Sequence, residues 1–518
     1  MRSFKSPVRN SRSPARTSGL RTRAAKVCAV RGRCNWGVIA LLAGMAAAGC
    51  SVGPDFRRPA PPSVTGYTPE PLPGATASAP VPGGEAQRFV PAVDIPAEWW
   101  SLFHSEALDH LIEEALRNNP DFAAAQAALR QANEKVYAAR GVLFPAVTAA
   151  IQPERERLNG AIIGEPQYAP TFTVITSALQ VSYAPDVFGG TRRQIESLAA
   201  HAEVQNFALE ATFLTLTTNV VVAAVQAASL RGQIEATGKI LGIETDELAL
   251  VRERFRVGVA SQAEVLLQES ALEQTRATLP PLRKQLALVR DELTALAGRL
   301  PSQELDVTFD LDGLTLPREL PVSLPSQLVE QRPDVRGAEA QLHAATADVG
   351  VAIANQLPQF SMTAAFGATA TALPDFPGTG IWSIAGSVSQ TLFDAGTLLH
   401  EKRAAVAALD EAADQYRSTV LKAFQNVTDT LRALQSDADA LAADEAAERA
   451  ASASLEVARR QFHAQTVDHL TVLTAERAWQ LARINRVQAQ ADRYADTAAL
   501  FQALGGGWWH RDDESPRQ

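Results

Sequence analysis

The feature that most constrains the fold is an internal repeat with an offset of about 210 residues. The triplet Asn119-Pro120-Asp121 recurs as Arg332-Pro333-Asp334, and Phe144-Pro145 recurs as Leu357-Pro358. Self-similarity at a fixed offset indicates one structural plan used twice. Each half is expected to contain a helix, a pair of strands, a long helix, a sharp turn and a second long helix.

The helices of this plan are too long for a compact globule. In residues 397 to about 460, apolar or small residues recur at spacings of three and four, as at Val420, Ala423, Val427 and Leu431. This is coiled-coil spacing over several heptads. At ~1.5 Å per residue, such a helix approaches ~100 Å in length. The stripe is therefore interpreted as a packing seam between helices.

Four segments interrupt the helical spacing and alternate instead. Residues 142–152 pair with 171–183, and residues 360–371 pair with 382–393, each pair joined by a loop rich in Gly and Pro. Alternation of large apolar and small polar residues over ~10 positions is typical of an outer-membrane barrel strand. Such strands must close without edges in lipid, and a barrel needs at least ~8 of them. The sequence therefore predicts a barrel shared between chains, with hairpins on a soluble sheet as the alternative.

The first 49 residues have the composition of a signal peptide. They contain ten basic residues and no acidic residue, and the apolar run at residues 36–48 is too short to span a bilayer. Small residues precede Cys50, as in a lipoprotein signal, so Cys50 is predicted to be acylated as the first mature residue. The aspartate that retains lipoproteins in the inner membrane is absent, because Ser51 follows. An ordinary cleaved signal with an incidental cysteine is the alternative.

The mature chain is strongly acidic. Removal of the signal changes the formal charge from -9 to -19, because all 57 acidic residues stay. This balance argues against nucleic-acid binding. Cys50 is then the single thiol, which excludes an intramolecular disulfide and a cysteine-based metal site. The sequence lacks G-x-S-x-G, Walker A and H-E-x-x-H motifs, so neither an enzyme nor a cofactor is expected.

These observations divide the chain into five parts. Residues 1–49 are the signal peptide, and residues 50–96, dense in Pro, Gly, Ala and Ser, are an extended N-terminal extension. Residues 97–315 and 316–507 are the two repeats, and residues 508–518 are a polar C-terminal tail.

Nearly the whole mature chain resembles the TolC-like outer-membrane factors of the NodT family. The resemblance is carried by residues 50–59, 98–121, 324–339 and 503–508. It implies an α+β membrane protein in the Gram-negative outer membrane, with a coiled-coil helical barrel below a β-barrel completed by trimerisation, four strands per chain. The implied function is the passive exit duct of a tripartite efflux pump for drugs or other small solutes. The implied partners are two further copies, a periplasmic adaptor, an inner-membrane transporter of the resistance-nodulation-division (RND) type and outer-membrane lipid.

Two alternatives remain beside this function. A channel for type I protein secretion would share the fold, although the acylated start and the ending at Gly507-Trp508 favour the efflux branch. A coiled-coil structural lipoprotein without a pore would conduct nothing.

The turns at residues 256–261 and 463–468 are the first candidate functional region. A glycine between two long helices supplies the left-handed conformation of a sharp reversal. The resemblance implies that these tips meet the adaptor, and the candidate contact residues are Val257, Gly258, Val259, Ser261, Gln465 and Thr466. Because Gln465 stands in the place of Gly258, the second reversal is expected to be made differently. A purely structural turn is the alternative.

A polar stripe beside the apolar seam is the second candidate region, and it includes Asp429 and Arg432. Residues 423–429 resemble the family stretch whose acidic residue lines the periplasmic constriction, so Asp429 is the candidate gate residue. The alternative is that Arg432, one turn further on, forms an ion pair with Asp429 on a solvated helix face.

Overall fold

The computed structural model describes residues 51–511, apart from residues 92, 158, 160, 162, 163, 165, 166 and 168. The predicted signal peptide, Cys50 and the last seven residues of the C-terminal tail lie outside the described residues.

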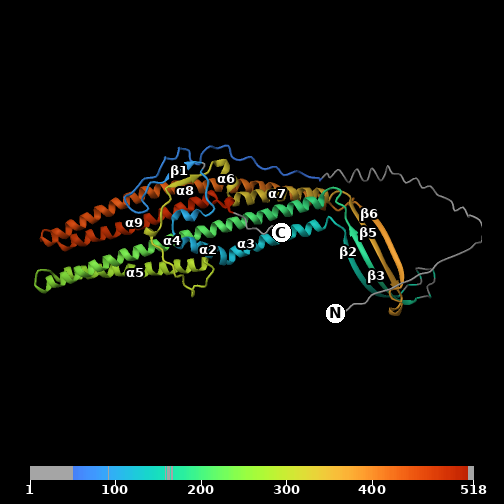
Figure 1. The fold of residues 1–518 in the computed structure, drawn as a ribbon, viewed down its shortest axis with the longest axis horizontal. Coiled ribbons are helices and arrows are strands. Elements are labelled where there is room, and N and C mark those ends of the chain that lie inside the picture. The colour runs from blue at the N-terminus through green and yellow to red at the C-terminus, as the bar shows by residue number, and fades with distance from the viewer. Residues whose placement is uncertain are drawn as a thin grey trace, which may run out of the picture. The chain divides into compact units, whose positions relative to one another are not determined.

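The expected two-fold plan is present (Figure 1). The first repeat contains α2 (Glu106–Asn118), α3 (Pro120–Gly141), β2 (Ala146–Arg157), β3 (Thr171–Tyr183), α4 (Gly190–Arg256) and α5 (Gln262–Leu296). The second contains α6 (Pro325–Gln331), α7 (Pro333–Ala354), β5 (Gln359–Ala370), β6 (Thr379–Ser389), α8 (Thr397–His463) and α9 (His469–Leu504). The repeat extends to element lengths, because α3 and α7 have 22 residues each and α4 and α8 have 67 each.

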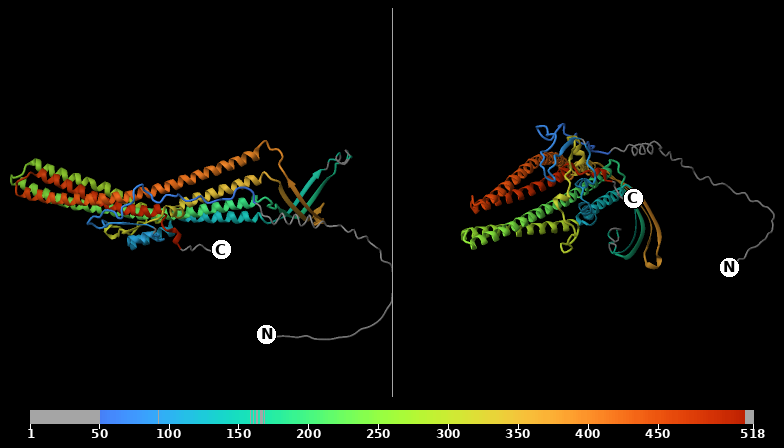
Figure 2. Two further views of the ribbon diagram at one scale, coloured as in Figure 1. Left: turned by 90° about the horizontal axis from the view of Figure 1, so that it is seen from above. Right: turned by 60° about the vertical axis from the view of Figure 1, so that its left-hand side comes forward.

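The helical hairpins α4–α5 and α8–α9 lie side by side. Their turns are at one end of α4 and α8, and the sheet is at the opposite end (Figures 1 and 2). The sheet has the order β2-β3-β5-β6 and is antiparallel throughout. Among the described residues, α4 is the one helix long and apolar enough to cross a membrane, yet two thirds of its apolar window is buried inside the protein. It is therefore a core helix of the bundle.

The main core lies midway along the helices. Trp99, in the 3-10 helix η1 (Trp99–Phe103), stacks on Phe501 of α9 at 5.2 Å between ring centroids, and both side chains are fully buried. The predicted seam of α8 is confirmed, because Val420, Ala423 and Val427 are buried. Alanine buries little surface, so this packing is spread over a long contact.

Two of the predicted strands are displaced along the chain: β2 ends at Arg157 rather than at 152, and β6 begins at Thr379 rather than at 382. β2 begins at Ala146, because the residues from Val142 to Phe144 form turns whose N–H groups donate to the carbonyls at the end of α3. β6 ends at Ser389, so Leu392 and Phe393, which were expected in the strand, lie in the connection to α8. β3 has the predicted bounds, and β5 differs by one residue at each end.

The N-terminal extension is part of the fold rather than a free tether. Its strand β1 (Arg88–Pro91) pairs in parallel with β4 (Glu319–Val322) at the start of the second repeat. The fully buried side chain of Gln87 donates to the carbonyl of Pro317 at 2.9 Å and to the hydroxyl of Thr497 at 3.0 Å. The extension therefore contacts both the first residues of the second repeat and α9.

Candidate functional site

The two faces of the sheet differ in polarity. One face presents a row in which Leu179 of β3 pairs with Phe366 of β5, which in turn pairs with Trp382 of β6. These three side chains are 51%, 71% and 75% exposed. The opposite face is polar, and there the hydroxyls of Ser361 and Ser387 lie 2.7 Å apart. An exposed apolar face opposite a polar one matches a membrane barrel strand, and no described part of the chain covers that face.

The sheet is open at both edges. Within the described residues, β2 pairs with β3 alone and β6 with β5 alone. The outer N–H and C=O groups of these edge strands therefore lack ladder partners, which is costly in a hydrocarbon environment. The strands alternate in direction, so β6 of one copy and β2 of the next have the relative direction that an antiparallel ladder requires.

The helical tips correct one expectation. Gly258 and Gln465 both have left-handed backbones, with φ of 82° and 58°. In the first tip the N–H of Val259 donates to the carbonyl of Arg254 at 2.8 Å, and in the second the N–H of Thr466 donates to the carbonyl of Gln461 at 3.0 Å. Both are Schellman closures. The prediction that the second reversal is made differently is therefore wrong.

All six candidate contact residues at the tips are exposed. The two hairpins begin their second helices with different caps. Ser261 forms a capping box with Glu264, whereas Asp468 accepts from the N–H of Thr471 at 3.0 Å. Val257 and Val259 are more than half exposed, so the first tip presents apolar side chains to solvent.

Asp429 and Arg432 lie far from the helical tips. Both are exposed near the middle of α8, and at ~1.5 Å per residue Asp429 lies ~50 Å from the tip. Asp429 accepts from the amide of Gln425 at 3.3 Å. Among the ion pairs of the described chain, none joins Asp429 to Arg432. The alternative of a simple pair is thus wrong, while a gating role stays a prediction.

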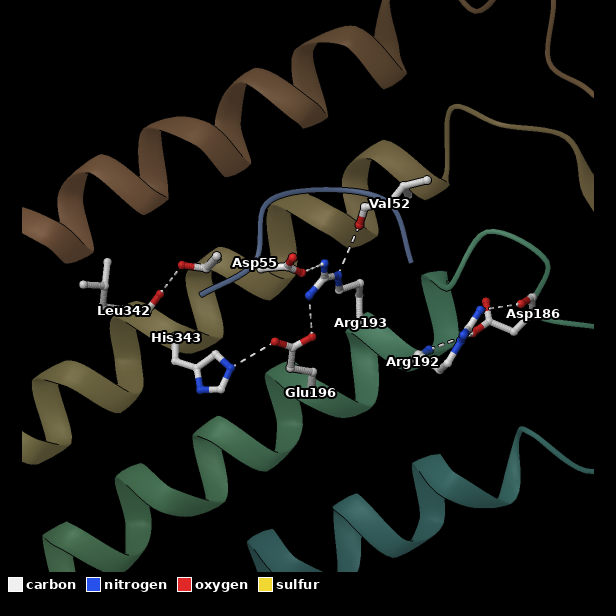
Figure 3. Close-up of polar contacts among 9 residues, drawn as sticks. Val52, Asp55, Asp186, Arg192, Arg193, Glu196, Leu342 and His343 are labelled. Atoms are coloured by element: carbon white, nitrogen blue, oxygen red, sulfur yellow. Dashed lines mark hydrogen bonds and ion pairs between the residues drawn. The ribbon is translucent and has the colours of Figure 1, made fainter. Parts of the chain in front are cut away.

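Val52 and Asp55 are fixed beside the start of α4 (Figure 3). The guanidinium of Arg193, 4% exposed, donates to the carbonyl of Val52 at 3.1 Å and to the carboxylates of Asp55 at 2.6 Å and Glu196 at 2.8 Å. Glu196 also contacts His343 of α7 at 3.0 Å. The segment from Val52 to Asp55 is therefore attached to a cluster that joins both repeats.

Sequence reasoning missed a buried polar cluster between the two hairpins. Arg459 of α8 contacts Glu247 of α4 at 2.9 Å and Glu476 of α9 at 2.7 Å. Burial and the neighbouring Glu476 together raise the pKa of Glu247 to about 8, although Arg459 opposes the shift. The sequence shows only that charged residues occur within the long helices. Periodicity along one helix does not tell which of them contact residues of another helix.

Metal chemistry has no candidate among the described residues, where no group of three or more His, Cys, Asp or Glu side chains is arranged to hold an ion.

Proteins of known family are similar to this chain in sequence and in fold. Residues 111–299 and 324–506 match the family of outer membrane efflux proteins. The pyoverdine export outer membrane protein OpmQ of Pseudomonas putida is 30% identical over 445 residues, which cover 85% of this chain and 94% of that protein. The probable efflux pump outer membrane protein TtgC, from the same species, is 28% identical over 91% of this chain and 95% of its own length.

Solved structures agree in fold. The outer-membrane channel OprN has a TM-score of 0.79 and 27% identity, covering 89% of this chain and 100% of that chain. The open state of the MtrE outer membrane channel of Neisseria gonorrhoeae has a TM-score of 0.75 at 23% identity, covering 89% and 99%. The matched repeats, the open-edged sheet and the long helical hairpins together show that this chain belongs to the outer membrane efflux protein family and is an outer-membrane efflux channel of a Gram-negative bacterium.

Proposed function

We propose that three copies of this chain assemble into one continuous exit duct, in which a twelve-stranded barrel crosses the outer membrane. The open-edged sheet carries this proposal. Four strands are too few to close a barrel, since the smallest have ~8, and both edges would be unsatisfied in lipid. Three sheets joined edge to edge remove every edge and turn the Leu179–Phe366–Trp382 row toward lipid.

The helical tips are proposed to meet the partners of a tripartite pump. The contact residues for a periplasmic adaptor are Val257, Gly258, Val259 and Ser261 of the first tip, and Gln465 and Thr466 of the second. Their exposure at the end of the hairpins away from the sheet supports this assignment. An inner-membrane RND transporter is proposed to supply the energy.

Acylation of Cys50 is proposed to anchor the chain to outer-membrane lipid. Val52 donates its N–H to the carbonyl of Phe188 at 3.0 Å, between the end of β3 and the start of α4. Val52 is therefore held between the sheet and the helices, which supports an anchor close to the outer membrane. Palmitate labelling should be lost in Cys50→Ser, and equal labelling of the two proteins would contradict the anchor.

Transport through the duct is proposed to be passive, without catalysis or cofactor. The relatives are named for pyoverdine export and for toluene efflux, cargoes with little chemistry in common. This supports a duct that accepts small solutes and leaves selection to the pump. Type I protein secretion is the second candidate; deleting the gene and measuring solute sensitivity beside protein export separates the two.

Asp429 is retained as a candidate for the duct wall, with Arg432 one turn further on. If Asp429 faces the lumen, three copies bring like charges together and favour cations. Asp429→Ala should then reduce cation preference in bilayer recordings, and Asp439→Ala should do less. Unchanged selectivity in Asp429→Ala would place this residue on the outer face.

Cross-linking tests the trimer directly. Thr148 of β2 and Ser387 of β6 lie on the polar face of opposite edge strands. In Cys50→Ser protein, Thr148→Cys combined with Cys at Ser383, Ala385 or Ser387 in turn should give a covalent trimer for the register that forms. The matched control places the second Cys on central strand β5, at Thr363. Monomers alone in every edge pair, or a conducting monomer in planar bilayers, would defeat the proposal.

A further inference from the structure

The hairpins α4–α5 and α8–α9 meet through buried polar side chains near their tips. Glu244, Gln268, His469 and Glu476 are all less than 5% exposed. An apolar seam holds helices together independently of pH, whereas a buried ionisable cluster does not. This contact between the hairpins is therefore sensitive to protonation.

The centre of the cluster is a triad formed by Glu247, Arg459 and Glu476. The Arg459 Nε atom donates to Glu247 Oε1 at 3.0 Å, and its Nη2 atom donates to Glu476 Oε1 at 2.7 Å. One guanidinium thus joins α4 to α9 while itself belonging to α8. The triad has one positive charge for two carboxylates, so it is neutral only when it also holds a proton.

Two orphaned oxygens show where that proton belongs. In the described structure, Glu247 Oε2 and Glu476 Oε2 are buried and have no hydrogen-bond partner. Buried acceptors without a partner are costly, and a proton shared between two carboxyl groups satisfies both. When Glu247 is protonated, its O–H donates to the Glu476 carboxylate, and Arg459 balances the remaining charge.

The neighbours add a second titrating group. The His469 Nε2 atom contacts Gln268 Oε1 of α5 at 2.8 Å, while its Nδ1 atom is buried without a partner. Burial lowers the pKa of His469. Other charged groups face the cluster from each helix: Glu244 and Arg254 from α4, Glu264 from α5, Arg459 from α8, and Asp468 and Arg477 from α9.

We propose that the Glu247–Arg459–Glu476 triad is a proton-operated latch, closed when the two carboxyl groups share one proton and weakened when both ionise. This rests on the proposed function in one respect, that the tips are the end of the trimeric duct that meets the periplasmic adaptor. Separation of the hairpins would let water reach the triad and remove the need for a shared proton.

The pH window follows from the two buried groups. The joined state binds a proton at Glu247 with a pKa of about 8, against 4.5 in water, so joining weakens as pH rises toward 8. His469 opposes this below its ordinary pKa of 6.5, because its proton favours the separated state. Glu244, whose pKa burial also raises, acts in the same sense as Glu247. Between about pH 6.5 and 8 the Glu247 effect is unopposed, and the separated-to-joined ratio rises about fifteenfold.

Spin-label distances test the latch in the full-length trimer. Val257→Cys and Thr466→Cys carry one label on each tip, and an excess of unlabelled chain leaves one labelled copy per trimer. The wild-type triad should show a longer-distance population that grows from pH 6.5 to 8.5. Glu247→Gln, whose amide replaces the protonated carboxyl, should remain joined at both pH values. The matched control is Glu253→Gln, an exposed α4 residue paired with Arg256, and it should behave as wild type.

A wild-type distance that does not change with pH, or a change that persists in Glu247→Gln, would overturn the proposal. Infrared spectra cover the case in which Glu247→Gln does not fold. The wild-type trimer should lose a protonated-carboxyl stretch between pH 6.5 and 8.5, and its absence at pH 6.5 would refute the latch. Neither readout requires conduction, so failure of the duct proposal in planar bilayers is a separate result.

Discussion

The two repeats form the same elements from different residues. α3 of the first repeat begins at a side-chain cap, because Asn119 Oδ1 accepts from the N–H groups of Asp121 and Phe122 at 2.9 and 3.1 Å. At the matching start of α7, Arg332 caps nothing. Its guanidinium donates to the carboxylate of Asp334 and to the carbonyl of Ala503.

The difference shows which features the repeat requires. Both helices have proline at the first position, where its fixed φ fits and its missing N–H costs nothing. The residue before the proline differs because its surroundings differ. In the second repeat that residue is used to attach α7 to the end of α9. The backbone plan is thus common to the repeats, while side-chain contacts are specific to each.

The sheet is where the repeats should behave alike, and it gives the largest expected effect. Leu179→Arg in the first repeat and Phe366→Arg in the second each put a charge on the proposed lipid face, at paired positions. Each should cost about 2–4 kcal/mol and lower the yield of folded trimer. Urea titration in detergent or liposomes measures the loss.

Gln180→Arg and Ala365→Arg are the controls for these variants, because this neighbouring pair lies on the polar face. Both controls should retain nearly full trimer yield. If a polar-face variant loses as much stability as its lipid-face neighbour, the assignment of the two faces is wrong.

The helix starts should separate the repeats. Asn119→Ala removes a cap and should cost about 1 kcal/mol. Arg332→Ala should cost more, about 1.5–3 kcal/mol, because it removes charged hydrogen bonds from a mostly buried position. Denaturant unfolding of both variants checks the order, and Arg117→Ala, on an exposed face of α2, is the control. Equal losses would mean that Arg332 contributes no more than a cap.

Periodicity predicted the repeat, the α8 seam and the alternating strands, because these depend on spacing within one segment. Val420 and Val427 are recognisable from spacing alone. The pairing of β1 with β4 was not predictable, since it joins residues more than two hundred positions apart with four residues each. Strand ends were also missed where Val142 and Phe393 have apolar side chains but lie in turns or loops.

The candidate sites were predictable to different degrees. The position of the tips could be predicted from Gly258 and the repeat, and the six candidate residues there are exposed in the structure. The position of Asp429 along the duct could not be predicted, because a polar stripe on a 67-residue helix does not indicate how far each residue lies from the tip. The Glu247–Arg459–Glu476 triad joins three helices, and no pattern within one of them reports the other two.

The tips give the smallest effect and compare the repeats most directly. Gly258 and Gln465 both have left-handed backbones at matching positions. This conformation has no steric cost for the glycine but strains the glutamine, which has a Cβ atom. The strain on a residue with a Cβ is about 1–2 kcal/mol, while a glycine adds about 0.5–1 kcal/mol of unfolded-state entropy. Gln465→Gly should therefore stabilise the α8–α9 hairpin by about 0.5–1 kcal/mol. Gly258→Gln should destabilise the α4–α5 hairpin by a similar amount. Hydrogen exchange of the amides flanking each turn measures both changes, with Gln461→Gly inside α8 as the control that should destabilise, because glycine weakens a helix interior. If Gln465→Gly also destabilises, the glutamine side chain contributes more at this tip than the strain of its backbone costs.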